Sequence, residues 1–434
     1  MAATSADRLD VIIFGASGFT GKYTVYEAVS VLNGLRWGVA GRNREKLQQV
    51  LKEMGAKAQK DLSQIPIIVA DVFDEASLLE MAKRCRIVVN TAGPYRFYGE
   101  KVVSACIEAG THHVDVSGEP QYMETMQLKY NERAKERGVY IVSACGFDSI
   151  PADMGVIFVE KNFDGVVNSV ETFIESGMKD GAPTDVGNAG LNYGTWESAV
   201  FGLAHADELR AIRKGLFPRR LPKFYPVLKQ RPLMFRSTEV DKVCLPFPGS
   251  DRSVVMRSQR FLYDNDKKRP VQMHAYICFP SWLVAITVAF FASIFGLMAK
   301  FQVGRRLLLQ YPGFFSAGLA SKSGPSEAAM ENSFFKMTIK ANGWPKSDRL
   351  AESTDQYTEP PNKTLSVRVT GPNPGYGATC VALLSTALTI LRESDKMPGT
   401  GGVLPPAAAF SKTSLISELE KHEHGMKFEI LANK

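Results

Sequence analysis

Val11-Ile-Ile-Phe-Gly15-Ala-Ser-Gly18-Phe-Thr-Gly21 is the stretch of sequence that decides the fold of this chain. Its four apolar residues predict a buried parallel strand, and the glycines predict a sharp turn into a helix. Gly15 permits the turn, Gly18 leaves bare backbone for a pyrophosphate, and Gly21 allows the helix to pack closely on the strand. The free N–H groups and positive end of the helix attract phosphates. The stretch therefore predicts a dinucleotide-binding Rossmann domain.

The candidate cofactor-binding residues of this turn are Gly15, Ser17, Gly18, Phe19, Thr20 and Gly21. Their spacing, GxxGxxG, occurs in many NADP-type Rossmann domains. A second strand is predicted at residues 35–40, and Arg42 follows it. An acidic side chain there would bind the adenosine ribose, whereas an arginine attracts a 2′-phosphate. The cofactor is therefore expected to be NADP(H); the alternative is that Arg42 only caps or decorates the helix predicted at 45–54.

Further apolar strands are predicted at residues 65–70, 86–90, 113–116 and 139–143, alternating with helices. This alternation indicates an α/β fold with a doubly wound parallel sheet. Asp71 follows the third strand, where an acid either borders the adenine pocket or caps the helix at 75–85. Asn90, Gly93 and Tyr95 follow the fourth strand, whose carboxyl end lies beside that of the first. The nicotinamide is expected there.

Hydride transfer is the cofactor's chemistry, and the protein supplies geometry and a proton. The Tyr-x-x-x-Lys spacing of short-chain reductases occurs at Tyr225 and Tyr263, but in proline-rich or charged segments. The proton donors expected near the nicotinamide are Tyr95, Glu119 and Asp148, of which Tyr95 and Asp148 are the catalytic candidates. The alternatives are that Tyr95 only packs, and that Asp148 caps the helix from residue 152 at a domain hinge.

The second half of the chain predicts an inserted domain. Residues 170–175, 271–277, 335–341 and 365–369 alternate apolar with polar side chains, which is typical of an antiparallel sheet with one wet face. Residues 375–393 predict a helix that returns to the first domain, and 415–430 a last helix and strand. We expect a Rossmann domain at 1–150, completed by 375–434, and an inserted α+β substrate and dimerisation domain at 151–374.

Five motifs resemble the saccharopine dehydrogenase family: Gly15-Ala-Ser-Gly-Phe-Thr-Gly21, Ala40-Gly-Arg42, Asn90-Thr-Ala-Gly-Pro-Tyr95, Asp115-Val-Ser-Gly-Glu119 and Gly146-Phe-Asp-Ser-Ile-Pro-Ala-Asp153. The resemblance runs nearly end to end, and it extends to an animal branch and to trans-acting enoyl reductases of mycobacterial lipid synthesis. It implies a split Rossmann domain, an inserted domain and a homodimer. It does not settle the reaction.

Two stretches are unusual for a soluble dehydrogenase. Residues 210–236 hold nine basic side chains and no acidic one. A solvated loop and a segment that contacts an anionic membrane both account for this charge. Nucleic acid is not expected, because no nucleic-acid-binding fold accompanies the charge. The second stretch, residues 281–299, carries no charge and would span about 28 Å as a helix. It is either deep core or membrane-associated.

Strands are predicted on both sides of 281–299 in one sheet, so a single membrane span is impossible. Basic residues also flank it on both sides. We therefore expect a monotopic insertion, with 307–319 completing a hairpin, into a cytosol-facing membrane such as a lipid droplet or the endoplasmic reticulum. The six cysteines show no CxxC motif and predict reduced, buried thiols. The histidines show no metal-binding spacing, and residues 1–10 no targeting signal.

Three functions remain open from the sequence. The first is an NADP(H)-dependent oxidoreductase that reduces a lipophilic substrate at a membrane or lipid-droplet surface. The second is a soluble amino-acid dehydrogenase of the saccharopine type, which needs paired arginines for the substrate carboxylates. The third is a non-catalytic NADP-binding membrane scaffold.

Overall fold

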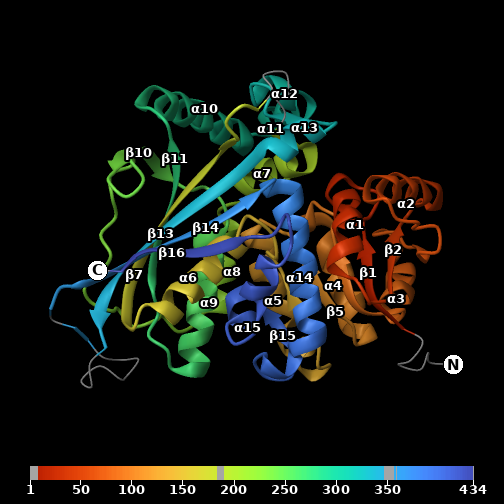
Figure 1. The fold of residues 1–434 in the computed structure, drawn as a ribbon, viewed down its shortest axis with the longest axis horizontal. Coiled ribbons are helices and arrows are strands. Elements are labelled where there is room, and N and C mark those ends of the chain that lie inside the picture. The colour runs from red at the N-terminus through yellow and green to blue at the C-terminus, as the bar shows by residue number, and fades with distance from the viewer. Residues whose placement is uncertain (1–7, 183–189, 347–355, 358, 434) are drawn as a thin grey trace.

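A computed structural model describes residues 8–182, 190–346, 356–357 and 359–433 of the chain. Residues 1–7, which belong to the segment without a predicted targeting signal, lie outside this range. Two seven-stranded sheets dominate the described part, with the first domain at one side of the molecule and the second sheet at the other (Figure 1). A two-stranded sheet pairs β8 (Leu191–Asn192) with β12 (Ala320–Ser321).

The first sheet is parallel and has the order β15-β6-β5-β4-β1-β2-β3. Its strands are β1 (Leu9–Phe14), β2 (Trp37–Gly41), β3 (Ile67–Val69), β4 (Cys85–Asn90), β5 (His112–Asp115), β6 (Tyr140–Val142) and β15 (Gly402–Leu404). The helices between them are α1 (Phe19–Val31), α2 (Arg44–Ala58), α3 (Glu75–Lys83), α4 (Tyr95–Ala109) and α5 (Pro120–Glu136). The order reverses between β1 and β4, so the predicted doubly wound α/β sheet is confirmed.

The second sheet has the order β16-β14-β13-β7-β11-β10-β9. Its strands are β7 (Gly165–Met178), β9 (Phe235–Ser237), β10 (Lys242–Pro246), β11 (Gln272–Phe279), β13 (Ser333–Pro345), β14 (Lys363–Pro372) and β16 (Lys427–Asn433). β7 pairs with β11 in parallel, while its other neighbour β13 and the remaining pairs are antiparallel. The sheet is thus mixed but mainly antiparallel, as predicted, and β7–β11 is the one parallel pair among its described strands. A long connection, which includes α9, lies between β7 and β11 and permits the parallel arrangement.

The expected wet face is absent along β7. Residues 167–174 are buried on both faces, and Glu171 forms a two-pronged ion pair with Arg231, with both N···O distances 2.7 Å. The Nδ2 of Asn168 donates to the carbonyl of Pro226. Arg231 and Pro226 both belong to the basic segment 210–236, so part of that segment covers the sheet, because the buried polar groups of β7 require partners. The interpretation of the whole segment as a solvated loop was therefore wrong.

The remaining helices connect and cover the two sheets. They are α6 (Ile150–Asn162), α7 (Tyr193–Ala204), α8 (Glu208–Leu216), α9 (Asp251–Asp266), α10 (Trp282–Lys300), α11 (Gln302–Gln310), α12 (Pro312–Phe315), α13 (Glu327–Asn332), a π-helical turn (Pro374–Ala378), α14 (Thr379–Glu393), a 3₁₀ turn (Ser394–Lys396), α15 (Pro406–Phe410) and α16 (Leu415–Glu420). α14 packs against α1, as expected of a helix returning to the first domain. The last strand, β16, pairs with β14 instead, so the segment expected at 375–434 is divided between the two sheets.

Within the described residues, two helical stretches are apolar and long enough to cross a membrane: Pro374–Lys396, which contains α14, and α10. The first is mostly buried and is a core helix. α10 lies at the edge of the molecule, above the second sheet (Figure 1). Only 11% of its most apolar 18-residue stretch is buried. The interpretation of residues 281–299 as deep core was therefore wrong. β11 and β13, on either side of α10 in the chain, lie in one sheet as predicted.

Candidate functional site

The glycine turn between β1 and α1 has the backbone that the sequence predicted. Gly15 has φ of +81°, a left-handed conformation that favours glycine. A Cβ on Gly21 would lie 2.2 Å from the carbonyl oxygen of Gly15, so only glycine allows the helix this close to the turn. The turn itself is exposed at Ser17 and Gly18. No side chain caps the start of α1, and its first turn carries no acidic residue. These features suit an anionic phosphate.

Phe19 and Thr20 form the first residues of α1. The ring of Phe19 packs against Tyr376, with 4.7 Å between ring centroids, and therefore fixes the helix to the turn before α14. The carbonyl of Thr20 accepts from the hydroxyl of Thr24 at 2.9 Å. Thus, the ring of Phe19 and the hydroxyl of Thr24 stabilise the start of α1, and the backbone N–H groups there are the groups that can face a phosphate.

Arg42 follows β2 and is exposed. Asn43, not Arg42, caps α2: its side chain accepts from the N–H of Lys46 at 2.8 Å, so the capping alternative for Arg42 was wrong. No hydrogen bond or ion pair within the described residues engages the Arg42 guanidinium. The Ser17 Oγ lies 3.7 Å from the position of a Cβ on Gly41, so this end of β2 lies beside the glycine turn. This position and the unused cation suit a 2′-phosphate.

Asp71 follows β3 but does not cap α3. Its Oδ1 accepts from the N–H of Phe73 at 3.0 Å, whereas Asp74 accepts from Ala76 and Ser77 and is the cap. The capping alternative was therefore wrong for Asp71. Its carboxylate shapes the loop at the carboxyl end of β3, on the side of the sheet where an adenine would lie.

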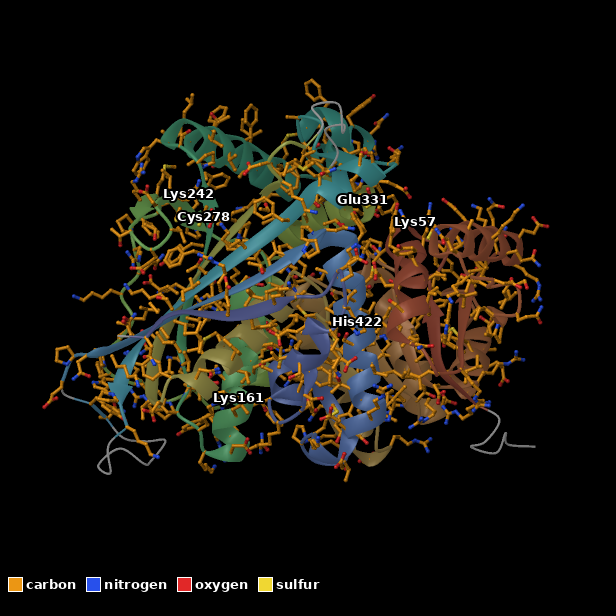
Figure 2. All side chains as sticks on the ribbon, in the orientation of Figure 1. Lys57, Lys161, Lys242, Cys278, Glu331 and His422 are labelled. Atoms are coloured by element: carbon orange, nitrogen blue, oxygen red, sulfur yellow. The ribbon has the colours of Figure 1, made fainter. Side chains whose placement is uncertain are left out.

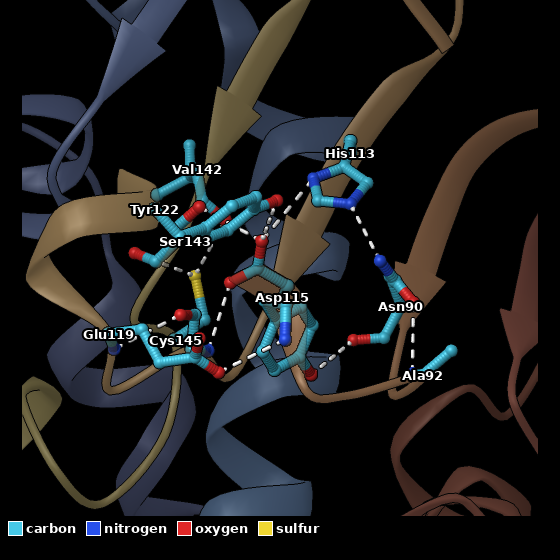
Figure 3. Close-up of polar contacts among 11 residues, drawn as sticks. Asn90, Ala92, His113, Asp115, Glu119, Tyr122, Val142, Ser143 and Cys145 are labelled. Carbon is cyan, nitrogen blue, oxygen red and sulfur yellow. Dashed lines mark hydrogen bonds and ion pairs between the residues drawn. The ribbon is translucent and has the colours of Figure 1, made fainter. Parts of the chain in front are cut away.

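Asn90, Gly93 and Tyr95 follow β4, and Figure 3 shows how Asn90 holds this loop. Its Oδ1 accepts from the N–H of Ala92 at 3.0 Å, and its Nδ2 donates to His113 at 3.3 Å. The hydroxyl of Tyr95 donates to the carbonyl of Asn90 at 3.0 Å. Tyr95 is buried, and this burial raises the pKa of its hydroxyl well above the usual value. Its contacts are those of a packing residue.

Asp115 at the end of β5 is the centre of a group of hydrogen bonds (Figure 3). The sequence did not predict this role. Its Oδ2 accepts from the hydroxyls of Tyr122 and Ser143, at 3.1 and 2.9 Å. Burial raises the pKa of Asp115 to about 6, and it lowers the pKa of His113 to about 3, so this histidine is neutral. The group ties the ends of β4, β5 and β6 together and fixes the loop beside the nicotinamide position.

Glu119 joins α4 to a helix of the second domain. Its two carboxylate oxygens accept from the N–H groups of Tyr95 and Arg96, each at 3.0 Å, at the start of α4. The hydroxyl of Ser198 on α7 donates to it at 2.9 Å. A carboxylate at a helix N-terminus is stabilised by the helix dipole. The motif that contains Glu119 was visible in the sequence, but its partner Ser198 was not.

Asp148 follows β6 at the boundary between the two domains. Glycines make room for its carboxylate: a Cβ on Gly118 or on Gly249 would lie 2.5 Å from a carboxylate oxygen. Ser250 donates to its Oδ2 at 3.2 Å. No side chain caps α6, so the capping role expected of Asp148 was wrong. Removal from water raises the pKa of Asp148 to about 7. Two of the residues around the Asp148 carboxylate, Gly249 and Ser250, come from the second domain.

The comparisons with known proteins agree with this geometry. Residues 11–142 match the family model described as saccharopine dehydrogenase NADP binding domain. The human saccharopine dehydrogenase-like oxidoreductase is 40% identical over 99% of both chains. A Caenorhabditis elegans protein named lipid droplet localized protein is 40% identical over 95% of this chain and 96% of its own. The chain belongs to the saccharopine dehydrogenase family. This membership was expected from its motifs.

The family's fold extends over the whole chain. The structure of Saccharomyces cerevisiae saccharopine dehydrogenase has a TM-score of 0.53 with this one, at 13% identity, covering 98% of this chain and 100% of that one. The protein is an oxidoreductase with NADP(H) as its cofactor, as predicted. The uncapped start of α1, the bare backbone at Gly18 and the free guanidinium of Arg42 fit this cofactor. Held by these residues, the cofactor would supply a hydride, and in a doubly wound sheet the nicotinamide would lie at the carboxyl ends of β1 and β4.

Replacing Arg42 by alanine is expected to weaken NADPH binding by more than about tenfold, while NADH binding stays nearly unchanged. A charge-assisted contact of this kind contributes about 1.5–3 kcal/mol, and NADH lacks the phosphate. Titration of both cofactors by fluorescence measures the difference. Arg44 is the matched control, because it is also exposed and its Nη1 faces the carbonyl of Ile67 at 3.5 Å. Equal losses for both cofactors would show that Arg42 is only structural.

Proposed function

We propose that this protein reduces a lipophilic substrate with NADPH while bound to the surface of a lipid droplet or of another cytosol-facing membrane such as the endoplasmic reticulum. The observation that carries the proposal is the orientation of α10. Most of its large apolar side chains face outward, and Leu283 is 75% exposed, Phe290 61% and Phe291 60%. The two buried residues of α10 are small: Ala285 and Ala299 are both fully buried. A helix in a soluble protein shows the opposite arrangement.

The apolar surface continues beyond α10. Val303 in α11 is 73% exposed, and Phe314 in α12 is 82% exposed. α11 packs against α10, and the side chain of Arg305 donates to the carbonyls of Ala299 and Lys300, both at 3.0 Å, which closes the turn between the two helices. This packing supports the helical hairpin expected from the sequence. An exposed apolar hairpin of this kind inserts into one leaflet, or into the single phospholipid layer of a droplet.

α7 connects this apolar surface to the cofactor site, which supports a substrate that arrives from the lipid. On one side, Trp196 packs against Phe295 of α10 at 4.8 Å between centroids, and its Nε1 donates to the carbonyl of Leu308 at 2.9 Å. On the other side, Ser198 donates to Glu119, beside the nicotinamide position. The 12-residue helix α7 thus contacts both the apolar helix α10 and Glu119 of the candidate site. A water-soluble substrate would not require this proximity.

We propose Asp148 rather than Tyr95 as the proton donor. The hydroxyl of Tyr95 is buried and committed to a backbone carbonyl. The carboxyl of Asp148 is half-buried, and with its pKa raised to about 7 it is partly protonated at neutral pH, as a general acid must be. Ser250 donates to the ionised carboxylate and holds this pKa below the value that burial alone would produce. Ser250 is therefore a positioning residue.

Replacing Asp148 by asparagine is expected to lower kcat by about a hundredfold or more, with NADPH affinity unchanged. In the wild type, the rate of reduction falls as the pH rises through about 7, because the carboxyl loses the proton that it donates. The asparagine variant loses this dependence. Ser250→Ala shifts the fall to higher pH, because the ionised carboxylate loses a donor. A pH profile of kcat for the three proteins measures this, and an unchanged profile in Asp148→Asn would contradict the assignment.

The proposed function is tested with the purified full chain and a panel of substrates. Lipid enones and ketones are presented in phospholipid vesicles with NADPH, and saccharopine is presented in solution with NADP⁺. We expect NADPH oxidation only with a vesicle-borne lipid. Turnover of saccharopine would favour the soluble amino-acid dehydrogenase, and NADPH binding without any turnover would favour the scaffold. Sedimentation of the same protein tests the homodimer, which we propose from the family resemblance.

A further inference from the structure

Two cysteines face each other across neighbouring strands of the second sheet. Cys244 on β10 and Cys278 on β11 are directly opposite in the antiparallel register, and their Sγ atoms are 3.5 Å apart. Residues directly opposite in such a pair have Cα atoms about 4.5–5.5 Å apart. This range lies within the Cα separation of about 4.4–6.8 Å that disulfides require. The two sulfurs can therefore bond without a change in the register of the strands.

The surroundings of the pair favour chemistry at sulfur. One of the two thiols donates its S–H to the other, and this contact lowers the pKa of the Cys244 thiol. The same bond, together with burial, raises the pKa of Cys278, which keeps its proton. Lys242 adds positive charge beside Cys278, and Figure 2 labels both at the edge of the molecule below α10. Cys244 is buried, whereas Cys278 is half-buried. A thiol of lowered pKa beside a second thiol is the arrangement of reactive cysteine pairs.

The other four cysteines are different. Cys85, Cys106, Cys145 and Cys380 are buried, and burial raises the pKa of each. Among the described contacts, Cys244 and Cys278 form the one pair of sulfurs close enough to interact directly. The expectation of reduced, buried thiols therefore suits these four, but it does not describe Cys278. Intracellular disulfides are mostly transient and redox-sensing, which is the class that this pair would join.

We propose that Cys244 and Cys278 are a reversible disulfide site, oxidised by hydrogen peroxide or a lipid hydroperoxide. The sulfur that is a thiolate attacks a peroxide oxygen, so that an S–O bond forms, the O–O bond breaks, and the leaving oxide takes the other thiol's proton as water or alcohol. The second sulfur, now a thiolate, attacks the first; the S–S bond forms, the S–O bond breaks, and hydroxide leaves and takes up a proton as water. The two sulfurs lose two electrons in total, and the peroxide gains them.

The position of the pair suggests what the bond would restrain. Only Phe279, Pro280 and Ser281 separate Cys278 from the first residue of α10, and α10 contacts both β10 and β11. A bond between the strands would fix the end of β11 from which α10 starts. Because the apolar face of α10 is the proposed lipid contact, peroxides formed in lipid would reach this site. The placement in lipid depends on the proposed function, but the disulfide chemistry does not.

The test uses the purified full chain in solution with hydrogen peroxide as the probe. After mild oxidation and denaturation, the free thiols per chain are expected to fall from six to four, and dithiothreitol should restore all six. A non-reduced digest analysed by mass spectrometry should contain the peptide of Cys244 linked to that of Cys278. Cys380→Ser is the matched control, because it removes a buried cysteine outside the pair and should still lose two thiols. The Cys278→Ser variant should lose no free thiol to an intramolecular disulfide.

Six free thiols after oxidation would overturn the proposal, as would oxidation of each sulfur separately to sulfinic acid without a cross-link. Because the linked peptide is sought in the unmodified protein, misfolding of a variant cannot hide the result. Adding vesicles that contain a lipid hydroperoxide tests the second oxidant. If hydrogen peroxide forms the disulfide but the protein does not bind vesicles, the redox site stands and the proposed membrane function fails.

Discussion

Replacing Leu283, Phe290, Phe291 and Leu297 together by glutamine is expected to release the protein from phospholipid vesicles. These side chains are 75%, 61%, 60% and 60% exposed and lie on the outward face of α10. Burying each in lipid contributes about 1.5 kcal/mol at the low end, or roughly 6 kcal/mol for four. Loss of this free energy lowers partitioning by more than about a thousandfold. Flotation with vesicles on a density gradient measures the effect.

Ile430→Gln with Leu431→Gln is the matched control, since these exposed apolar residues, at 50% and 40%, lie on β16, at the opposite edge of the second sheet from β10, which α10 contacts. This double variant should float like the wild type, and both variants should bind NADPH normally. A wild-type protein that never floats would contradict membrane association. If the α10 variant floats unchanged but changes from dimer to monomer in sedimentation, then the apolar face is a subunit interface. Substituting these side chains is a more specific test than deleting α10, because the deletion would also expose Trp196.

Replacing Gly18 by valine is expected to abolish measurable NADPH binding while the fold is retained. Gly18 has φ of −77°, which any residue adopts, and the one atom near a new Cβ is the carbonyl oxygen of Gly15 at 3.2 Å. The chain can accommodate valine with a small shift. A pyrophosphate held against this backbone cannot, because the branched side chain would occupy its position. We expect at least about a hundredfold loss of affinity, or about 2.7 kcal/mol.

Circular dichroism and the NADPH titration are compared with those of Gly202→Val, the matched control. Gly202 lies on α7, and no atom lies within 4 Å of the position of its Cβ. Gly21 is a poor site for this test, because a side chain there would collide with backbone at 2.2 Å and disturb the packing of α1. Normal NADPH binding by Gly18→Val would remove this turn from the cofactor site.

Much of the first sheet could be predicted because its signals are local. Each apolar strand and each helix cap lies within a few residues of the sequence that specifies it, and the glycine turn requires no distant partner. Tyr95 shows the limit of this reasoning. Its position beside the nicotinamide followed from topology, but the hydrogen bond that commits its hydroxyl depends on the exact path of the loop at Asn90. The proton donor therefore could not be chosen from the sequence.

The contacts that complete the site come from residues far apart in the chain. Ser198 reaches Glu119 and Ser250 reaches Asp148 only after the second domain folds against the first. Likewise, the sequence placed Arg231 in a basic segment that either a solvated loop or a membrane contact explained, and the structure placed it against the buried Glu171. Burial decides the protonation of such groups, and burial is a property of the whole fold.

By itself, the sequence determined the dinucleotide-binding sheet, the preference for NADP(H) and an apolar helix with strands on both sides. Those features depend on residue type and on spacing along the chain. Only the tertiary structure decided that α10 directs its large side chains outward and that Cys244 faces Cys278. The physical reason is that a hydrophobic pattern shows which residues avoid water, but not whether protein or lipid replaces the water around them. Only packing against the rest of the chain distinguishes the two.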